Sequence, residues 1–212
     1  PYWGVYFDTD PPHGEHTRWD TSELPGSWVD ALIMLRNMTG SDEGIEVEEK
    51  LKELLLFHFG AKGLRYNESY PWSEKIYCSV HEQGYIFNGL LSWYLDSKER
   101  RVKEAIEGLI RGLTEISIYQ NAGMGMMIPQ LQNAELGSLA PSIETLPYRF
   151  LPHEVYTPSY GWELSSTSDV IFNSTVILAL VNYYEETGDE CAETLAREMI
   201  NYIVYYLSLI HI

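Results

Sequence analysis

The stretch LVNYYEETGD, residues 180–189, decides the fold class of this chain. Apolar residues at helical spacing lead into it from Val170. Its polar end contains Gly188, and glycine is the residue that most often ends a helix. A second amphipathic stretch, rich in alanine, follows from Ala192 to Ile203. A helix, a short polar turn and another helix predict an antiparallel helical hairpin.

The hairpin pattern occurs three times, with turn centres at Gly40, Ser97 and Gly188. The copy at Met38-Thr39-Gly40 is close, and the copy at Leu95-Asp96-Ser97-Lys98 is degenerate. The predicted helices cover residues 27–38, from after 42 to near 60, from 79 or 80 to 95, 102–116, from 168 or 169 to 181, and 192–203. We expect Ser27 to cap the first of them. The chain is therefore predicted to be all-α.

Three irregular regions separate these helices: residues 1–25, 62–77 and 120–166. The last contains too many glycines and prolines for a long helix, and its segments 146–151 and 154–156 are predicted as short strands. Loops of this length in a compact helical domain are usually functional or carry their own small structure.

Composition and charge exclude several classes of function. Lys and Arg total 14 against 31 Asp and Glu, a formal charge of −17. An acidic surface repels phosphate backbones, so we expect no nucleic-acid partner. The chain contains no run of ~18 apolar residues, so we expect no membrane insertion. Two cysteines, Cys78 and Cys191, stand too far apart in sequence to indicate a disulfide framework or a cysteine-based zinc site.

The helix–Thr-Gly-Asp–helix unit at 180–189 resembles that of the six-hairpin glycosidases, which are (α/α)6 toroids. This superfamily includes unsaturated glucuronyl hydrolases, β-L-arabinofuranosidases and N-acylglucosamine epimerases. The passage from Trp72 through His81-Glu82-Gln83-Gly84 to Tyr94 is similar to the way such proteins lead from an aromatic loop into an inner helix. The resemblance covers most of the chain, but its motifs are architectural.

The resemblance implies a single domain over residues 1–212, forming part of an (α/α)6 toroid with a long loop insertion at 120–166. Three hairpins are half of such a toroid, so we expect the chain to be a fragment of a larger protein. Residues 207–212 resemble translated sequencing-adapter read-through, and the last turn of a helix is the alternative. The zinc-bound cysteine mechanism of some β-L-arabinofuranosidases needs clustered cysteines, which this chain lacks. We expect neither a metal nor a cofactor.

In such toroids the N-termini of the inner helices face one mouth. The segments before those helices here each contain a carboxylate, and glycoside hydrolysis needs two carboxyl groups. The candidate catalytic residues are Asp20, Glu82, Glu163 and Asp169. The alternative is structural, with Asp20 and Asp169 as helix caps and Glu82 as a partner of the helix dipole.

Aromatic residues make up 13% of the chain, and tryptophan rings stack well on sugars. The candidate substrate-binding residues are His16, Arg18, Trp19, Trp72, His81 and Trp162. Trp28 and Trp93 fall within predicted helices and are expected in the core. The segment from Asp8 to His16 is dense in His and Asp, but its prolines and Gly14 favour a structural or substrate-binding loop over a metal site.

We expect a carbohydrate-active enzyme with a carbohydrate partner, most specifically a glycoside hydrolase acting through paired carboxylates. The alternative is a non-catalytic helical module that binds glycans or peptides. A terpenoid-cyclase-like toroid is disfavoured, because Asp8-Thr9-Asp10 lacks the fuller acidic motif and the Gln-Trp repeats are missing. The sugar, the linkage, the oligomeric state and the localisation stay open.

Overall fold

The structure is a computed structural model, and it describes ten stretches of the chain: residues 3–16, 23–57, 59–60, 62–65, 67–68, 76–120, 147–151, 154–157, 163–164 and 170–207. Six α-helices dominate these residues: α1 (Glu23–Thr39), α2 (Ile45–Phe57), α3 (Val80–Ser97), α4 (Arg100–Ile116), α5 (Val170–Thr187) and α6 (Glu190–Asn201). A π-helical turn, Tyr202–Leu207, continues α6. The prediction of an all-α chain is confirmed.

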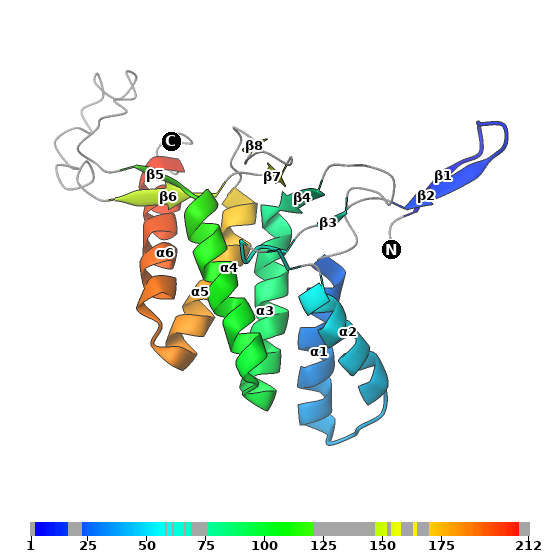
Figure 1. Ribbon diagram of the computed structural model, residues 1–212, viewed down its shortest axis with the longest axis horizontal. Coiled ribbons are helices and arrows are strands. Elements are labelled where there is room, and N and C mark those ends of the chain that lie inside the picture. The colour runs from blue at the N-terminus through cyan, green and yellow to red at the C-terminus, as the bar shows by residue number, and fades with distance from the viewer. Residues whose placement is uncertain are drawn as a thin grey trace.

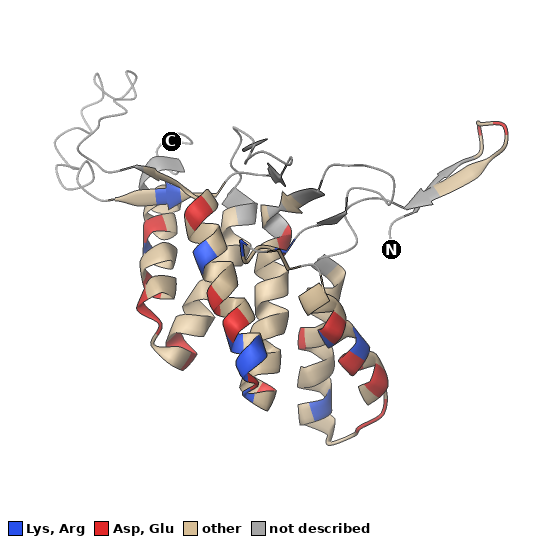
Figure 2. Cartoon of the chain, in the orientation of Figure 1, with Lys and Arg blue, Asp and Glu red and all other residues tan. Residues whose placement is uncertain are grey.

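The helices pair into three antiparallel hairpins, α1–α2, α3–α4 and α5–α6, and all three short turns lie at the same end (Figure 1). Helices α1, α3 and α5 contact one another in that order and form an inner row. Charged side chains gather on the outer helices, α2, α4 and α6, whereas the inner helices carry few (Figure 2). This division of charge is typical of a buried row covered by a solvent-facing one.

The three turns have the same hydrogen bonds. A hydroxyl from Thr39, Ser97 or Thr187 donates to the carbonyl four residues earlier, at 2.6 to 3.0 Å. The same oxygen accepts from the backbone N–H two residues later, at 3.2 to 3.3 Å. The residue between takes a positive φ: 67° at Gly40, 57° at Lys98 and 71° at Gly188.

These matching turns define equivalent positions, 58 residues apart between hairpins one and two and 90 apart between two and three. They also refine the predicted turn centre of the second hairpin. Lys98, not Ser97, occupies the place of the glycines. A lysine with positive φ carries no sequence signal, because the left-handed region is uncommon for residues other than Gly, Asn and Asp.

Two glycines of α3 let this helix approach both of its inner neighbours closely. A Cβ added to Gly89 of α3 would lie 2.6 Å from the carbonyl oxygen of Gly26 in α1. A Cβ on Gly84 would lie 2.7 Å from Thr175 of α5. A real Cβ cannot occupy such distances, so α3 packs closely on both neighbours only because these two positions are glycine.

Short strands lie at the end opposite the hairpin turns (Figure 1). A four-stranded antiparallel sheet has the order β3–β4–β7–β8, and β5 pairs with β6. The bounds are β3 (Asn67–Glu68), β4 (Ile76–Ser79), β5 (Ile118–Gln120), β6 (Tyr148–Phe150), β7 (Glu154–Thr157) and β8 (Glu163–Leu164). The two strands predicted within 146–156 are confirmed, and β4 leads directly into α3.

The N-terminal region differs from its prediction. Strands β1 (Trp3–Tyr6) and β2 (His13–His16) form a hairpin within a region predicted to be irregular, and this hairpin projects beyond α1 (Figure 1). Helix α1 begins at Glu23, so Ser27 lies inside it and is not its cap. Pro25 falls in the first turn, where a missing N–H costs no intrahelical bond.

The two helical tryptophans also differ from one another. Trp93 is 0% exposed and belongs to the core, as predicted. Trp28 is 46% exposed, so its predicted core position is wrong.

Within the described ranges, no helix combines the length and apolar character that crossing a bilayer requires.

Candidate functional site

The candidate site lies where the N-termini of α1, α3 and α5 meet the strands, at the end opposite the hairpin turns (Figure 1). Helix N-termini carry partial positive charge and unsatisfied N–H groups, which stabilise anions and polar ligands. Helix α3 is central in the inner row, and its first turn contains the one candidate carboxylate whose side chain the structure describes, Glu82.

Glu82 is 0% exposed. Burying a carboxylate without compensating partners is costly, so its surroundings decide what it does. Its repeat-equivalent positions carry Leu24 in hairpin one and Phe172 in hairpin three. Both are apolar, so the repeat architecture does not require a carboxylate at this place.

The next residue, Gln83, holds the segment around Arg65, which precedes β3, through hydrogen bonds. Its Oε1 accepts a hydrogen bond from the backbone N–H of Arg65 at 3.0 Å, and its Nε2 donates to the carbonyl of Arg65 at 3.0 Å. The buried amide therefore pairs with the backbone as a neighbouring strand would. This pairing places Arg65 against the first turn of α3.

Asn173 makes a related contact in hairpin three, at the position equivalent to Gln83. It is buried, and its Oδ1 accepts a hydrogen bond from the backbone N–H of Leu151 at 2.9 Å. Asn173 also belongs to an Asn-Ser-Thr glycosylation pattern, but a buried side chain is not accessible for modification. Gln83 and Asn173, at equivalent positions, thus hold two segments between helices against the inner row: the one that contains Arg65 and the one that contains Leu151.

Three ionisable groups interact electrostatically beneath these segments. The Arg65 side chain is fully buried, and burial lowers the pKa of Arg65 to about 10, although the charge of Glu82 acts in the opposite direction. Burial raises the pKa of the Cys78 thiol, and the charge of Glu82 raises it further. Cys78 is therefore held as a neutral thiol and is not an activated nucleophile. Arg65 and Glu82 are the other two ionisable groups of this cluster, and their opposite charges attract.

Three other predicted residues are described only by their backbones. Glu163 lies in β8, where it pairs with Tyr156 of β7, and β7 in turn pairs with β4. Glu163 is therefore in the sheet that leads into α3. His81 is the second residue of α3, next to Glu82. His16 ends β2, in the hairpin that projects away from α3 (Figure 1).

The remaining predicted site residues, Asp20, Asp169, Arg18, Trp19, Trp72 and Trp162, lie outside the described residues. Sequence reasoning missed Arg65, because a single arginine in an irregular segment carries no periodic or motif signal. Among the residues described here, no group of three or more His, Cys, Asp or Glu side chains is placed to hold a metal ion.

No protein-family model matches this chain, and neither a curated protein nor a solved structure matches it.

Proposed function

We propose that this chain is part of a carbohydrate-active (α/α) toroid, a glycoside hydrolase, with Glu82 as one of its two carboxyl groups. The observation that carries this proposal is the placement of Glu82. It is a buried glutamate in the first turn of the central inner helix, at a position where the other two hairpins have Leu24 and Phe172. A carboxylate outside the needs of the repeat is a candidate for function.

The electrostatics of the cluster assign Glu82 a role within this proposal. Burial favours the neutral form of a carboxyl group and a nearby guanidinium favours the ionised form; Arg65 is the cation that interacts electrostatically with Glu82. An ionised carboxylate acts as base or nucleophile, whereas the proton donor must be a protonated carboxyl group. We therefore assign base or nucleophile to Glu82. The general acid comes from Asp20, Glu163 or Asp169.

The full burial of Glu82 supports a second function. In that function Glu82 and Arg65 form a structural pair that holds the 59–65 segment on α3, and the strand end binds a glycan without chemistry. Breaking such a buried pair destabilises a protein by ~3–5 kcal/mol. The two functions therefore predict different effects of removing the Glu82 charge. In the hydrolase the loss lowers turnover, whereas in the binding module it lowers stability alone.

A panel of aryl glycosides and oligosaccharides, assayed with the wild-type chain and Glu82→Gln, separates these functions. The matched control is Glu48→Gln, because Glu48 is likewise a buried glutamate but lies in α2, where it pairs with Arg36 and Lys52. Asp20→Asn, Glu163→Gln and Asp169→Asn complete the set. Circular dichroism melting is measured for every variant.

For the hydrolase, Glu82→Gln lowers kcat by ~10²- to 10⁴-fold and Glu48→Gln leaves kcat within about twofold. One of the other three variants loses activity on a similar scale. Wild-type rates in all four site variants contradict the assignment of carboxylates. Binding of glycans without turnover of any substrate supports the binding module.

A further inference from the structure

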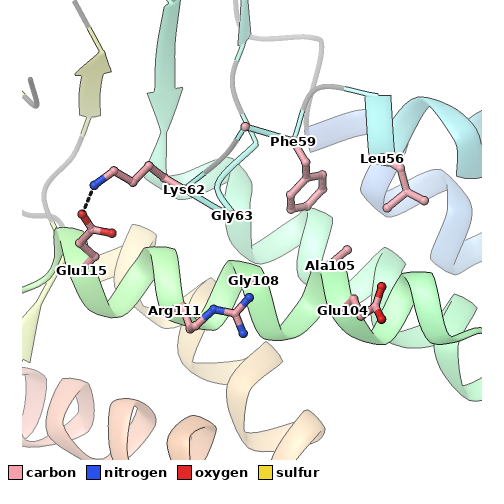
Figure 3. A pocket seen from close by; sticks show the side chains of 10 residues that line it. Leu56, Phe59, Lys62, Gly63, Glu104, Ala105, Gly108, Arg111 and Glu115 are labelled. Carbon is pink, nitrogen blue, oxygen red and sulfur yellow. Dashed lines mark hydrogen bonds and ion pairs between the residues drawn. The ribbon is translucent and has the colours of Figure 1, made fainter. Parts of the chain in front are cut away.

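A pocket of about 410 Å³ lies on the outer side of the array, between helix α4 and the segment that follows α2 (Figure 3). It is separate from the Glu82 cluster, which lies at the first turn of α3. The described residues that line it come from two parts of the fold. One part is the end of α2 with residues 59–63, and the other is one face of α4. They are Leu56, Phe59, Gly60, Lys62, Gly63, Glu104, Ala105, Gly108, Arg111 and Glu115.

Backbone packing builds one wall of this pocket. Gly63 has a φ of 77°, and a Cβ on it would overlap the carbonyl of Gly108. The Gly63 turn is held by a hydrogen bond from its N–H to the carbonyl of Gly60 at 2.9 Å. The segment therefore lies directly on the helix at Gly108, and the pocket opens beside this contact.

The pocket is lined by two cations, Lys62 and Arg111, and by two carboxylates, Glu104 and Glu115. Lys62 forms an ion pair with Glu115 across the pocket, from the loop to α4 (Figure 3). Glu104 pairs with Arg100, one turn earlier on α4, at 3.3 Å. Each lining carboxylate thus has an ion-pair partner other than Arg111. Arg111 is the remaining charge.

Arg111 differs from the other arginines that the structure describes, which are Arg36, Arg65, Arg100, Arg101, Arg149 and Arg197. Each of those six has an ion pair, a hydrogen bond or an electrostatic partner. Arg111 has neither a hydrogen bond nor an ion pair with any described residue, and one of its terminal nitrogens lies 3.7 Å from where a Cβ on Gly108 would stand. In a chain with a net charge of −17, an arginine without a carboxylate partner is a local exception.

We propose that this pocket binds a small organic monocarboxylate whose body is an apolar ring. The planar guanidinium of Arg111 matches a carboxylate through two parallel hydrogen bonds. Phe59, Leu56 and Ala105 supply the apolar surface for the ring. The volume lies within the ~300–1,000 Å³ typical of small-molecule sites. A polyanion is excluded, because a single free cation stands between Glu104 and Glu115.

The test is titration of the wild-type chain with sodium benzoate, followed by isothermal calorimetry and by NMR shifts of the Gly63 and Gly108 amides. Benzamide is the uncharged analogue. We expect benzoate to bind at least tenfold more tightly than benzamide. Arg111→Gln should weaken benzoate binding by ~10- to 100-fold, the range expected for losing a charge-assisted pair of hydrogen bonds.

Two further variants make the result specific. Arg197→Gln is the matched control, since Arg197 is an exposed arginine on α6 that does not line the pocket. It should leave binding unchanged. Gly108→Ala places a methyl group at an ordinary contact distance from Gly63 and Arg111, so it should fold and bind benzoate more weakly. Equal affinity in wild type and Arg111→Gln, or no saturable binding of benzoate by the wild type, overturns the proposal.

Discussion

Leu35 and Trp93 occupy the same position in successive hairpins and have opposite exposures. The carbonyl of Leu35 accepts a hydrogen bond from Thr39, and the carbonyl of Trp93 accepts one from Ser97. Trp93 is 0% exposed, whereas Leu35 is 56% exposed. Two cations lie over the ring of Trp93: Lys52 of the preceding hairpin, 5.7 Å from its centroid, and Arg101 of its own hairpin, at 4.9 Å. Helix α1 begins the described row, so the corresponding side of Leu35 is open.

This difference predicts opposite mutational effects at equivalent positions. We expect Trp93→Ala to lower the free energy of unfolding by ~3–5 kcal/mol, because it leaves a cavity between hairpins one and two. Leu35→Ala should change it by less than about 0.5 kcal/mol, as is usual for surface positions. Urea denaturation, monitored by the far-ultraviolet circular dichroism of the helices, measures the free energy of unfolding of both variants. Comparable losses in the two variants would show that α1 is covered in solution.

The open side of α1 also predicts self-association. Trp28, Leu35 and Met38 are 46%, 56% and 81% exposed, and exposed apolar patches drive association. We expect light scattering to show concentration-dependent association of the chain, and Leu35→Gln with Met38→Gln to reduce it. Leu178→Gln is the control for an exposed apolar residue on another inner helix, α5. A monomeric wild type at all accessible concentrations would contradict this prediction.

The ion-pair network at the hairpin turns predicts a loss of stability in acid. Arg36 contacts Glu48 through two nitrogens at 3.1 Å each and Asp96 at 2.6 Å. Burial alone raises the pKa of Glu48, but hydrogen bonds from Arg36 and Lys52 outweigh burial and hold it below its usual 4.5. For Asp96, burial likewise acts upward, and hydrogen bonds from Arg36 and Asn37 hold the pKa below 3.8.

A carboxyl group whose pKa is lower in the folded state stabilises that state above its unfolded pKa, and the stabilisation is lost as the pH falls. The melting temperature of the wild type should therefore fall more steeply below about pH 4.5 than that of Arg36→Gln. Arg100→Gln, which removes an exposed arginine paired with Glu104, should keep the wild-type slope. Parallel pH profiles for wild type and Arg36→Gln would show that Arg36 does not set these pKa values.

The close approach of α1 and α3 predicts that two helical glycines respond differently to alanine. Gly89→Ala places its Cβ 2.6 Å from a backbone oxygen of Gly26, so the helices must separate. We expect a loss of ~1–3 kcal/mol in the free energy of unfolding. Gly108→Ala meets its nearest atom at 3.6 Å and should gain up to ~1 kcal/mol from helix propensity. Thermal melts of both variants test the contact, and an unchanged Gly89→Ala would contradict it.

The sequence by itself determined the helices and their pairing. Apolar spacing located α3 and α4 closely, and the turn residues at Gly40 and Gly188 predicted helical hairpins, whose turns the structure places at one end. These features are local: a helix face and a glycine turn depend on residues within a few positions of each other. The two strands predicted in 146–156 follow the same rule.

Only the tertiary structure decided which members of the repeat are covered and which polar groups meet. Trp28 and Trp93 have similar helical surroundings in sequence, yet only Trp93 is buried, with Lys52 of hairpin one and Arg101 of its own hairpin over its ring. Arg65 interacts electrostatically with Glu82 because Gln83 holds the Arg65 backbone through hydrogen bonds that span 18 positions. Burial and electrostatic contact depend on what lies nearby in space, and no spacing along one chain encodes that directly.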